Sequence, residues 1–258
     1  MWNRRELKTQ AKEFLRKHYW KAFLAVFLTS ILTGGVRPNI EVQNRGHSIN
    51  QNTLNNQISD NVPLPAIIDD YFGGMNKSPM LSVGIGLFLV ISIIASIATV
   101  MIGYVVQVGQ SKFFLDGFKG DVSVSNLLAF FNKEEYWPIV KTQFKRALLT
   151  FLWTLLFIIP GFIKAIEYSL VPYILAEEPT LSSSEAINRS KKLTKGHKMD
   201  MFILTLSFFP WYLLNFVTFG LATFFINPYI EATTAKLYNV LSKDISPEYE
   251  FVDFNKVL

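Results

Sequence analysis

The fold is decided by residues 80–106, which read MLSVGIGLFLVISIIASIATVMIGYVV and contain no charged side chain. The uncharged run is longer still, because no charged residue lies between Lys77 and Lys112. A second run without charge lies between Asp200 and Glu231. A helix needs about 20 apolar residues to cross the roughly 30 Å hydrocarbon core of a bilayer. These two runs predict an all-α, polytopic helical membrane protein and argue against a soluble single-domain enzyme.

The composition argues against several classes of function. Half of the 258 residues are hydrophobic, 17% are charged, and the formal net charge is +5. Because the basic residues gather beside the apolar runs, we attribute them to membrane topology and anionic lipid and expect no nucleic-acid partner. The absence of cysteine excludes disulfides and thiolate nucleophiles, and the three histidines have no zinc-binding spacing. We expect no catalytic residue, no cofactor and no metal.

The N-terminus predicts an amphipathic interfacial helix over residues 1–20 and a first span at about 21–35. Apolar residues recur there at helical spacing while basic residues fill the remaining circumference, as in helices that lie among lipid headgroups. The apolar side is formed by Leu7, Ala11, Phe14, Leu15 and His18. A cleaved signal peptide is the alternative, but no A-x-A-like cleavage site follows Gly35.

The remaining chain completes a single integral membrane domain, 1–258, with about six spans. Residues 36–79 are rich in Asn and Gln and predict a polar extracytoplasmic insertion. Further spans are expected at about 80–106, 140–160, 161–177, 199–216 and 219–239. Pro160-Gly161 predicts the turn of a hairpin, either full or re-entrant. Ser182 with Glu185 matches a capping box, and Gly196 predicts the end of that cytosolic helix.

The distribution of Lys and Arg predicts the orientation in the cell membrane. With six spans, 21 of the 25 Lys and Arg residues lie on one side, which the positive-inside rule assigns to the cytoplasm. Both termini are then cytoplasmic. If 201–230 were one kinked span, five crossings would place the C-terminus outside.

Several short blocks resemble the bacterial integral membrane family catalogued as domain of unknown function 975. They run in order from the N-terminus to about residue 240, and the family is common in Gram-positive bacteria. The resemblance implies a multi-spanning protein without a settled activity. The layout is also similar to membrane domains attached to some glycerophosphodiester phosphodiesterases, whose catalytic barrel is absent here. The blocks are Arg5-Glu6-Leu7-Lys8, Tyr19-Trp20, Ile159-Pro160-Gly161, Tyr168-Ser169-Leu170, Tyr173-Ile174-Leu175-Ala176, Glu185-Ala186 with Ser190, Lys195-Gly196-His197-Lys198 and Asn227-Pro228-Tyr229.

Two sets of residues are candidates for function. Lys164 and Glu167 are spaced i, i+3 directly after Pro160-Gly161, and ionisable residues at membrane depth are costly and often functional. Alternatively, the two merely pair or snorkel near the outer surface. A polar intramembrane cavity would also include Tyr168, Tyr173, Asn215, Asn227 and Glu231. The second set is a basic cluster that either contacts anionic lipid headgroups or only signals topology: Arg189, Lys191, Lys192, Lys195, His197 and Lys198.

Three hypotheses for function remain open. The first is a non-enzymatic membrane protein in envelope maintenance, in lipid interaction or as an accessory to a membrane complex. The second is a small transporter or channel-like carrier with its polar site near Lys164 and Glu167. The third is a membrane-embedded lipid enzyme, although the sequence holds no recognisable acid–base set. The expected partner is the phospholipid bilayer, while a membrane protein partner or a second copy stays open.

Overall fold

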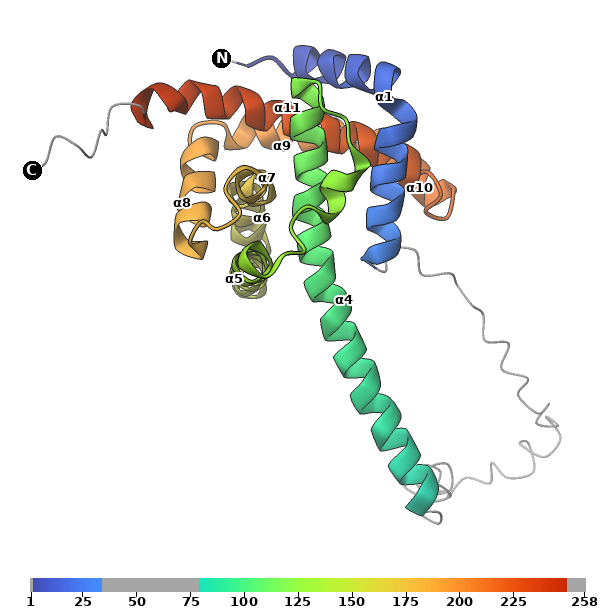
Figure 1. Ribbon diagram of the computed structural model, residues 1–258. Coiled ribbons are helices and arrows are strands. Elements are labelled where there is room, and N and C mark those ends of the chain that lie inside the picture. The colour runs from blue at the N-terminus through green and yellow to red at the C-terminus, as the bar shows by residue number, and fades with distance from the viewer. Residues whose placement is uncertain (1, 34–78, 250–258) are drawn as a thin grey trace, which may run out of the picture. The chain divides into compact units, whose positions relative to one another are not determined.

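The structure is a computed structural model that describes residues 2–33 and 79–249, and Figure 1 labels their helices. Every regular element in these ranges is a helix, as predicted. The chain divides into two compact units, Met1–Gly35 with Val100–Leu258, and Val36–Thr99. Of the predicted extracytoplasmic insertion, residues 36–78 lie outside the described residues.

Helix α1, Arg4–Leu32, joins the predicted interfacial helix and the first span into one kinked element. The Asn3 side chain caps its start by accepting a hydrogen bond from the Arg5 N–H, and His18 leaves helical geometry with φ −127°. The predicted inner face is confirmed, because Leu7, Ala11, Phe14 and Leu15 are buried. The kink separates this amphipathic half from the apolar half that follows.

Helix α4, Pro79–Lys119, is 41 residues long and exceeds the predicted span 80–106 at its C-terminal end. In the second unit, all large apolar side chains from Leu87 to Ile97 are exposed, as is Val83. From Val105 onward the same helix packs in the core of the first unit. Phe113 and Phe114 belong to this buried face, so the packed part of the helix continues beyond the uncharged run. The 3-10 turn η1, Val124–Leu128, follows, and Leu127 packs in the same core.

The predicted hairpin turn lies three residues earlier than expected. Helix α5, Lys133–Leu156, ends before Phe157, which has extended backbone, and α6 is Ile158–Glu167. Pro160 is the third residue of α6, where a helix needs no N–H donor, so the proline starts the helix instead of breaking it. Gly161 packs directly on α5, since a Cβ there would lie 2.4 Å from Thr154 Oγ1.

Helix α7, Val171–Glu177, follows α6 and is buried from Val171 to Ala176. Helix α8, Ser183–Thr194, confirms the capping box, because the Ser182 side chain accepts from the Glu185 N–H at 3.3 Å. The predicted helix end is also confirmed, since Gly196 has φ +84°.

The predicted span 199–216 is divided into α9, Lys198–Leu206, and α10, Phe209–Val217. Pro210, in the first turn of α10, lacks the N–H that a continuous helix would donate to Leu206, which explains the break. A turn at Phe219 and Gly220, with φ 51° and 92°, leads to α11, Thr223–Tyr249. That turn lies at the start of the predicted span 219–239, and α11 continues ten residues beyond the end of that span.

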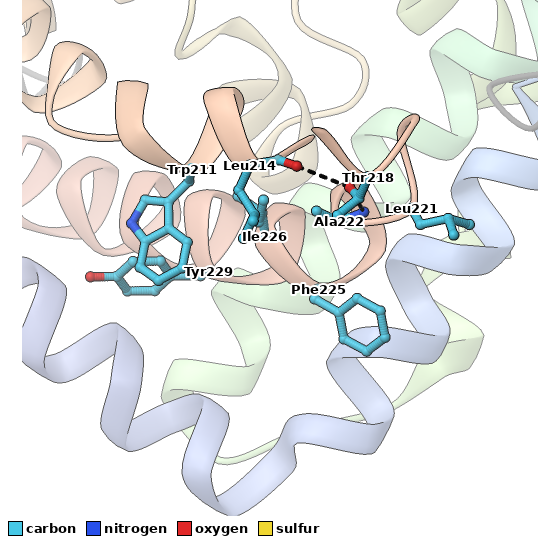
Figure 2. Close-up of a pocket in the computed structure, with 8 residues that line it drawn as sticks. All are labelled: Trp211, Leu214, Thr218, Leu221, Ala222, Phe225, Ile226 and Tyr229. Atoms are coloured by element: carbon cyan, nitrogen blue, oxygen red, sulfur yellow. Dashed lines mark hydrogen bonds between the residues drawn. The ribbon is translucent and has the colours of Figure 1, made fainter. Parts of the chain in front are cut away.

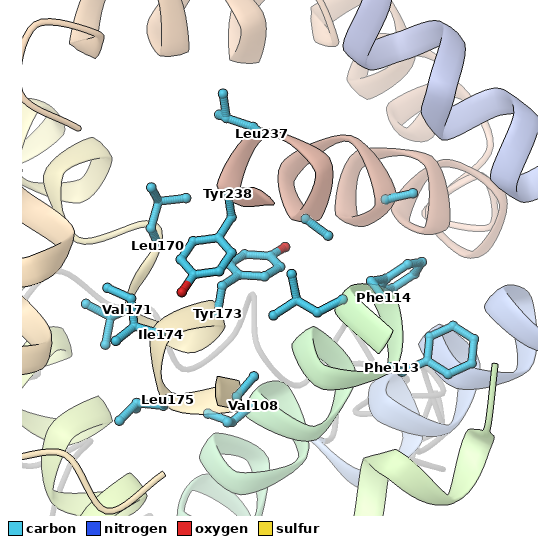
Figure 3. Close-up of a cluster of buried hydrophobic side chains, with 14 of the residues drawn as sticks. Val108, Phe113, Phe114, Leu170, Val171, Tyr173, Ile174, Leu175, Leu237 and Tyr238 are labelled. Carbon is cyan, nitrogen blue, oxygen red and sulfur yellow. The ribbon is translucent and has the colours of Figure 1, made fainter. Parts of the chain in front are cut away.

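The core of the first unit is formed by α1, α4, α5, α7, α8, α9 and α11. Figure 3 shows the part of this core that comes from α4, α7 and α11. Tyr173 of α7 stacks on Tyr238 of α11 with ring centroids 5.8 Å apart, and Ile174 and Leu175 are fully buried beside them. Helices α1 and α11 pack along each other. In this pairing the ring centroids of Phe23 and Phe225 lie 5.6 Å apart.

Three segments of the described chain are long and apolar enough to cross a membrane: Val83–Lys119, Ile158–Glu177 and Lys198–Val217. The six predicted spans are thus shown only in part. The segment Ile158–Glu177 contains α6, which exposes apolar side chains, and α7, which is packed inside the protein.

Candidate functional site

The structure joins Lys164 and Glu167 of the first predicted set with Lys198 of the second in one ion cluster at the C-terminal end of α6. The Glu167 carboxylate, with the residue only 6% exposed, accepts from Lys164 Nζ at 2.7 Å and from Lys198 Nζ on its other oxygen. Lys198 is the first residue of α9, so the cluster ties α6 to α9. We call Lys164, Glu167 and Lys198 the ion triad.

The surroundings hold the ion triad in place. Ser190 of α8 donates its hydroxyl to the Glu167 carbonyl oxygen at 2.7 Å. Lys164 Nζ also lies 5.4 Å from the centre of the Trp153 ring, and Lys191 Nζ lies 5.7 Å from that of Tyr168. Among the three groups of the triad, two ammonium groups share one carboxylate, which leaves an excess of one positive charge.

A second polar cluster lies between α4, α5, α7 and α11, where Tyr173 and Gln110 are buried and the other members are half-buried. Tyr173 donates to Glu231 Oε2 at 2.7 Å, and the Gln110 side chain also bonds to Glu231. Arg146 interacts electrostatically with Glu231 and donates to Gln107 Oε1 at 3.2 Å. We call these five residues the Glu231 cluster.

Sequence reasoning found Tyr173 and Glu231 but missed the partners on α4 and α5. A signal for them existed, because Gln107 and Gln110 are the polar interruptions at the end of the uncharged run and are spaced i, i+3. Arg146 borders the next apolar run. The ion triad and the Glu231 cluster are separate hydrogen-bonded groups.

The two predicted asparagines have other surroundings. Asn215 Oδ1 accepts from the Thr223 N–H and from its hydroxyl, and so closes the turn between α10 and α11. Asn227 is half-buried on α11, one turn before Glu231.

A pocket of about 420 Å³ between α10 and α11 is lined by apolar side chains. Among them, the Thr218 hydroxyl donates to the Leu214 carbonyl oxygen (Figure 2).

The members of the predicted basic cluster differ in their contacts. Arg189 pairs with Glu178; burial lowers the pKa of Arg189, but the bond to Glu178 outweighs it and raises that pKa. The His197 ring lies 6.3 Å from the Trp2 ring. Lys192 and Lys195 are on the exposed surface. Only Lys198 of this cluster joins the ion triad.

Residues 154–244 match the family described as Protein of unknown function (DUF975). The predicted resemblance is thereby confirmed for this region, which includes the blocks from Ile159-Pro160-Gly161 to Asn227-Pro228-Tyr229. The N-terminal blocks, Arg5 to Lys8 and Tyr19-Trp20, lie outside the match. No curated protein and no solved structure matched the chain.

The DUF975 region contains the whole ion triad but only part of the Glu231 cluster. Tyr173 and Glu231 lie inside it, whereas Gln107, Gln110 and Arg146 lie before it. No group of three or more His, Asp or Glu side chains suited to a metal occurs in residues 2–33 and 79–249.

Proposed function

We propose that this chain is a non-enzymatic integral membrane protein that acts in the lipid phase, in envelope maintenance, in lipid interaction or as an accessory to a membrane complex. The DUF975 family carries no assigned activity, so the proposal rests on the structure. The three segments long enough to cross a membrane support it.

The observation that carries the proposal is where apolar side chains are exposed. Most of the large exposed apolar residues fall in four described segments without Asp, Glu, Lys or Arg: 22–33, 83–111, 147–163 and 201–230. Ile158 is 80% exposed and Phe219 is 98% exposed. In water each Å² of such surface would cost about 25 cal/mol, a cost that lipid removes.

The borders of these segments support the same proposal. Basic residues stand beside three of them: Lys21 before the first, Lys112 after the second and Lys164 after the third. Lysine and arginine at the ends of apolar helices place their charges in the headgroup region while their stems lie along the apolar surface.

The finer topology belongs to the proposal as well. We propose six crossings with both termini cytoplasmic, in the cell membrane, with a re-entrant α5–α6 hairpin as the alternative. The charge-free part of α5, 147–156, is ten residues or about 15 Å long, which is half the hydrocarbon core. A re-entrant hairpin would leave four crossings. Either number is even and keeps the C-terminus on the side of the N-terminus.

Membrane extraction and topology reporters test the proposal. An integral protein stays in the membrane pellet in alkaline carbonate and is released only by detergent. Reporters fused at Asn55 and at the C-terminus are expected to give extracytoplasmic and cytoplasmic signals, respectively. Release by carbonate would contradict membrane integration, and a cytoplasmic Asn55 would overturn the topology.

A carrier is the second candidate, and the Glu231 cluster favours it. A carboxylate among apolar helices is costly and often functional, and Glu231 is held there by the hydrogen bond from Tyr173. Solute flux in proteoliposomes tests this candidate. Flux that survives alanine at both Lys164 and Glu167, and also at Glu231, would remove it.

A further inference from the structure

Helices α6 and α9 enclose an apolar groove, and neither the ion triad nor the Glu231 cluster explains its role. Its volume is about 650 Å³, and its walls include Ile159 and Ile163 of α6 and Met199 of α9. Phe162 and Phe202 face each other edge to face across the two helices, with centroids 5.6 Å apart. These walls are made of hydrocarbon side chains, so an extended apolar chain is the chemistry that fits them.

One charged side chain lines this groove, that of Lys198. Lys198 is also part of the ion triad, and its side chain remains 40% exposed beside a Glu167 side chain that is 7% exposed. Because Lys164 already neutralises Glu167, the triad holds an excess positive charge next to the groove. A cation of this kind, near a low-dielectric surface, favours an anion close by.

We propose that the groove binds one anionic phospholipid, with its phosphate at Lys198 and an acyl chain along α6. The inference rests on the proposed function, because it needs the α6–α9 face to lie in lipid. It deepens that function by naming the lipid class and the site. A free phosphate would meet Lys198 but leave the apolar walls uncovered, and a neutral lipid would leave the excess charge unpaired.

The test counts lipids bound to the full-length protein in detergent by native mass spectrometry. Phosphatidylglycerol and phosphatidylcholine are added in separate series. We expect one phosphatidylglycerol to bind about tenfold more tightly than phosphatidylcholine, because both carry a phosphate but the choline cation of phosphatidylcholine offsets its negative charge. Equal binding of the two lipids would overturn the charge assignment.

Two variants separate the head of the lipid from its chain. Lys198→Gln is expected to abolish the tenfold preference. Ile163→Trp keeps the ion triad and fills the groove, so it is expected to weaken both lipids about tenfold or more. Unchanged binding in Ile163→Trp would contradict the site. This second variant keeps the inference testable if Lys198→Gln fails to fold.

Matched controls guard against general effects of charge and size. Lys195→Gln removes an exposed charge three residues away and should keep the preference. Leu221→Trp enlarges a side chain at the other apolar pocket and should leave binding unchanged. A loss in Lys195→Gln equal to that in Lys198→Gln would overturn the inference, as would full competition by inorganic phosphate. Both failures leave carbonate-resistant membrane integration intact, so they are distinct from failure of the proposed function.

Discussion

Helices α6 and α7 are neighbours in the sequence and are both apolar, yet they have opposite surroundings. In α6, Ile159 is 76% exposed, whereas Ile174 of α7 is completely buried in the core of the first unit (Figure 3). Together the two helices make up one segment that is long and apolar enough to span a membrane. Hydropathy therefore identifies an apolar segment but does not tell whether lipid or protein covers its surface.

Truncating one isoleucine in each helix tests this comparison most strongly. Ile174→Ala should cost about 2–5 kcal/mol of unfolding free energy, because it opens a cavity in a packed core. Ile159→Ala should cost less than about 0.5 kcal/mol in detergent, where no protein packing is lost. Thermal or denaturant unfolding in the same detergent measures both. Equal losses would mean that α6 and α7 do not differ as described.

The contact between α5 and α6 gives a second expected effect. Gly161→Ala places a Cβ 2.4 Å from Thr154 Oγ1 and 2.5 Å from its Cα, so the hairpin must open, at a cost of about 1–3 kcal/mol. Gly84→Ala is the matched control, since a Cβ there meets nothing within 4 Å, and alanine favours helix by about 1 kcal/mol. Unfolding midpoints compare the two. A neutral Gly161→Ala would refute the close packing of the hairpin.

The buried helix α7 also depends on a hydrogen bond. Tyr173→Phe removes the phenol that donates to Glu231 and should cost about 1–2 kcal/mol. Tyr212→Phe, at an exposed tyrosine of α10, should be neutral. The measurement is again unfolding in detergent. Similar losses of unfolding free energy in the two variants would contradict a buried hydrogen bond between Tyr173 and Glu231.

The smallest effect concerns the cap of α8, which carries Ser190 to Glu167. Ser182→Ala should cost about 1 kcal/mol, because it removes the acceptor for the Glu185 N–H. Ser182→Asp should retain the stability, since aspartate is an equally good cap. Helix content and unfolding midpoint report both variants. Loss in both would show that the hydroxyl acts in some other way.

Local features of the fold were predictable from the sequence. The two halves of α1, the cap at Ser182, the end at Gly196 and the turn before α11 follow from residues within one or two helical turns. The break expected at Pro160-Gly161 lies at Phe157, and the break before α10 was not predicted, because Pro160 and Pro210 each stand in the first turn of a helix. A proline inside an apolar run is compatible with a kink, a turn or a helix start.

The candidate sites were predictable only in part, for a physical reason. The spacing of Lys164 and Glu167 predicts their pairing within one helix. The hydrogen bond between Glu167 and Lys198, and that between Arg146 and Gln107, join helices far apart in the sequence. Such contacts depend on tertiary packing, which periodicity does not encode.

The accessibility of a nitroxide at residue 159 tests membrane embedding of the charge-free surface most directly. Because the chain has no native cysteine, Ile159→Cys and Lys133→Cys can each carry a single spin label in reconstituted bilayers. If this surface lies in lipid, the label at 159 collides readily with oxygen and rarely with a water-soluble nickel chelate, while the label at 133 shows the reverse. A label at 159 as accessible to the nickel chelate as that at 133 would contradict membrane embedding.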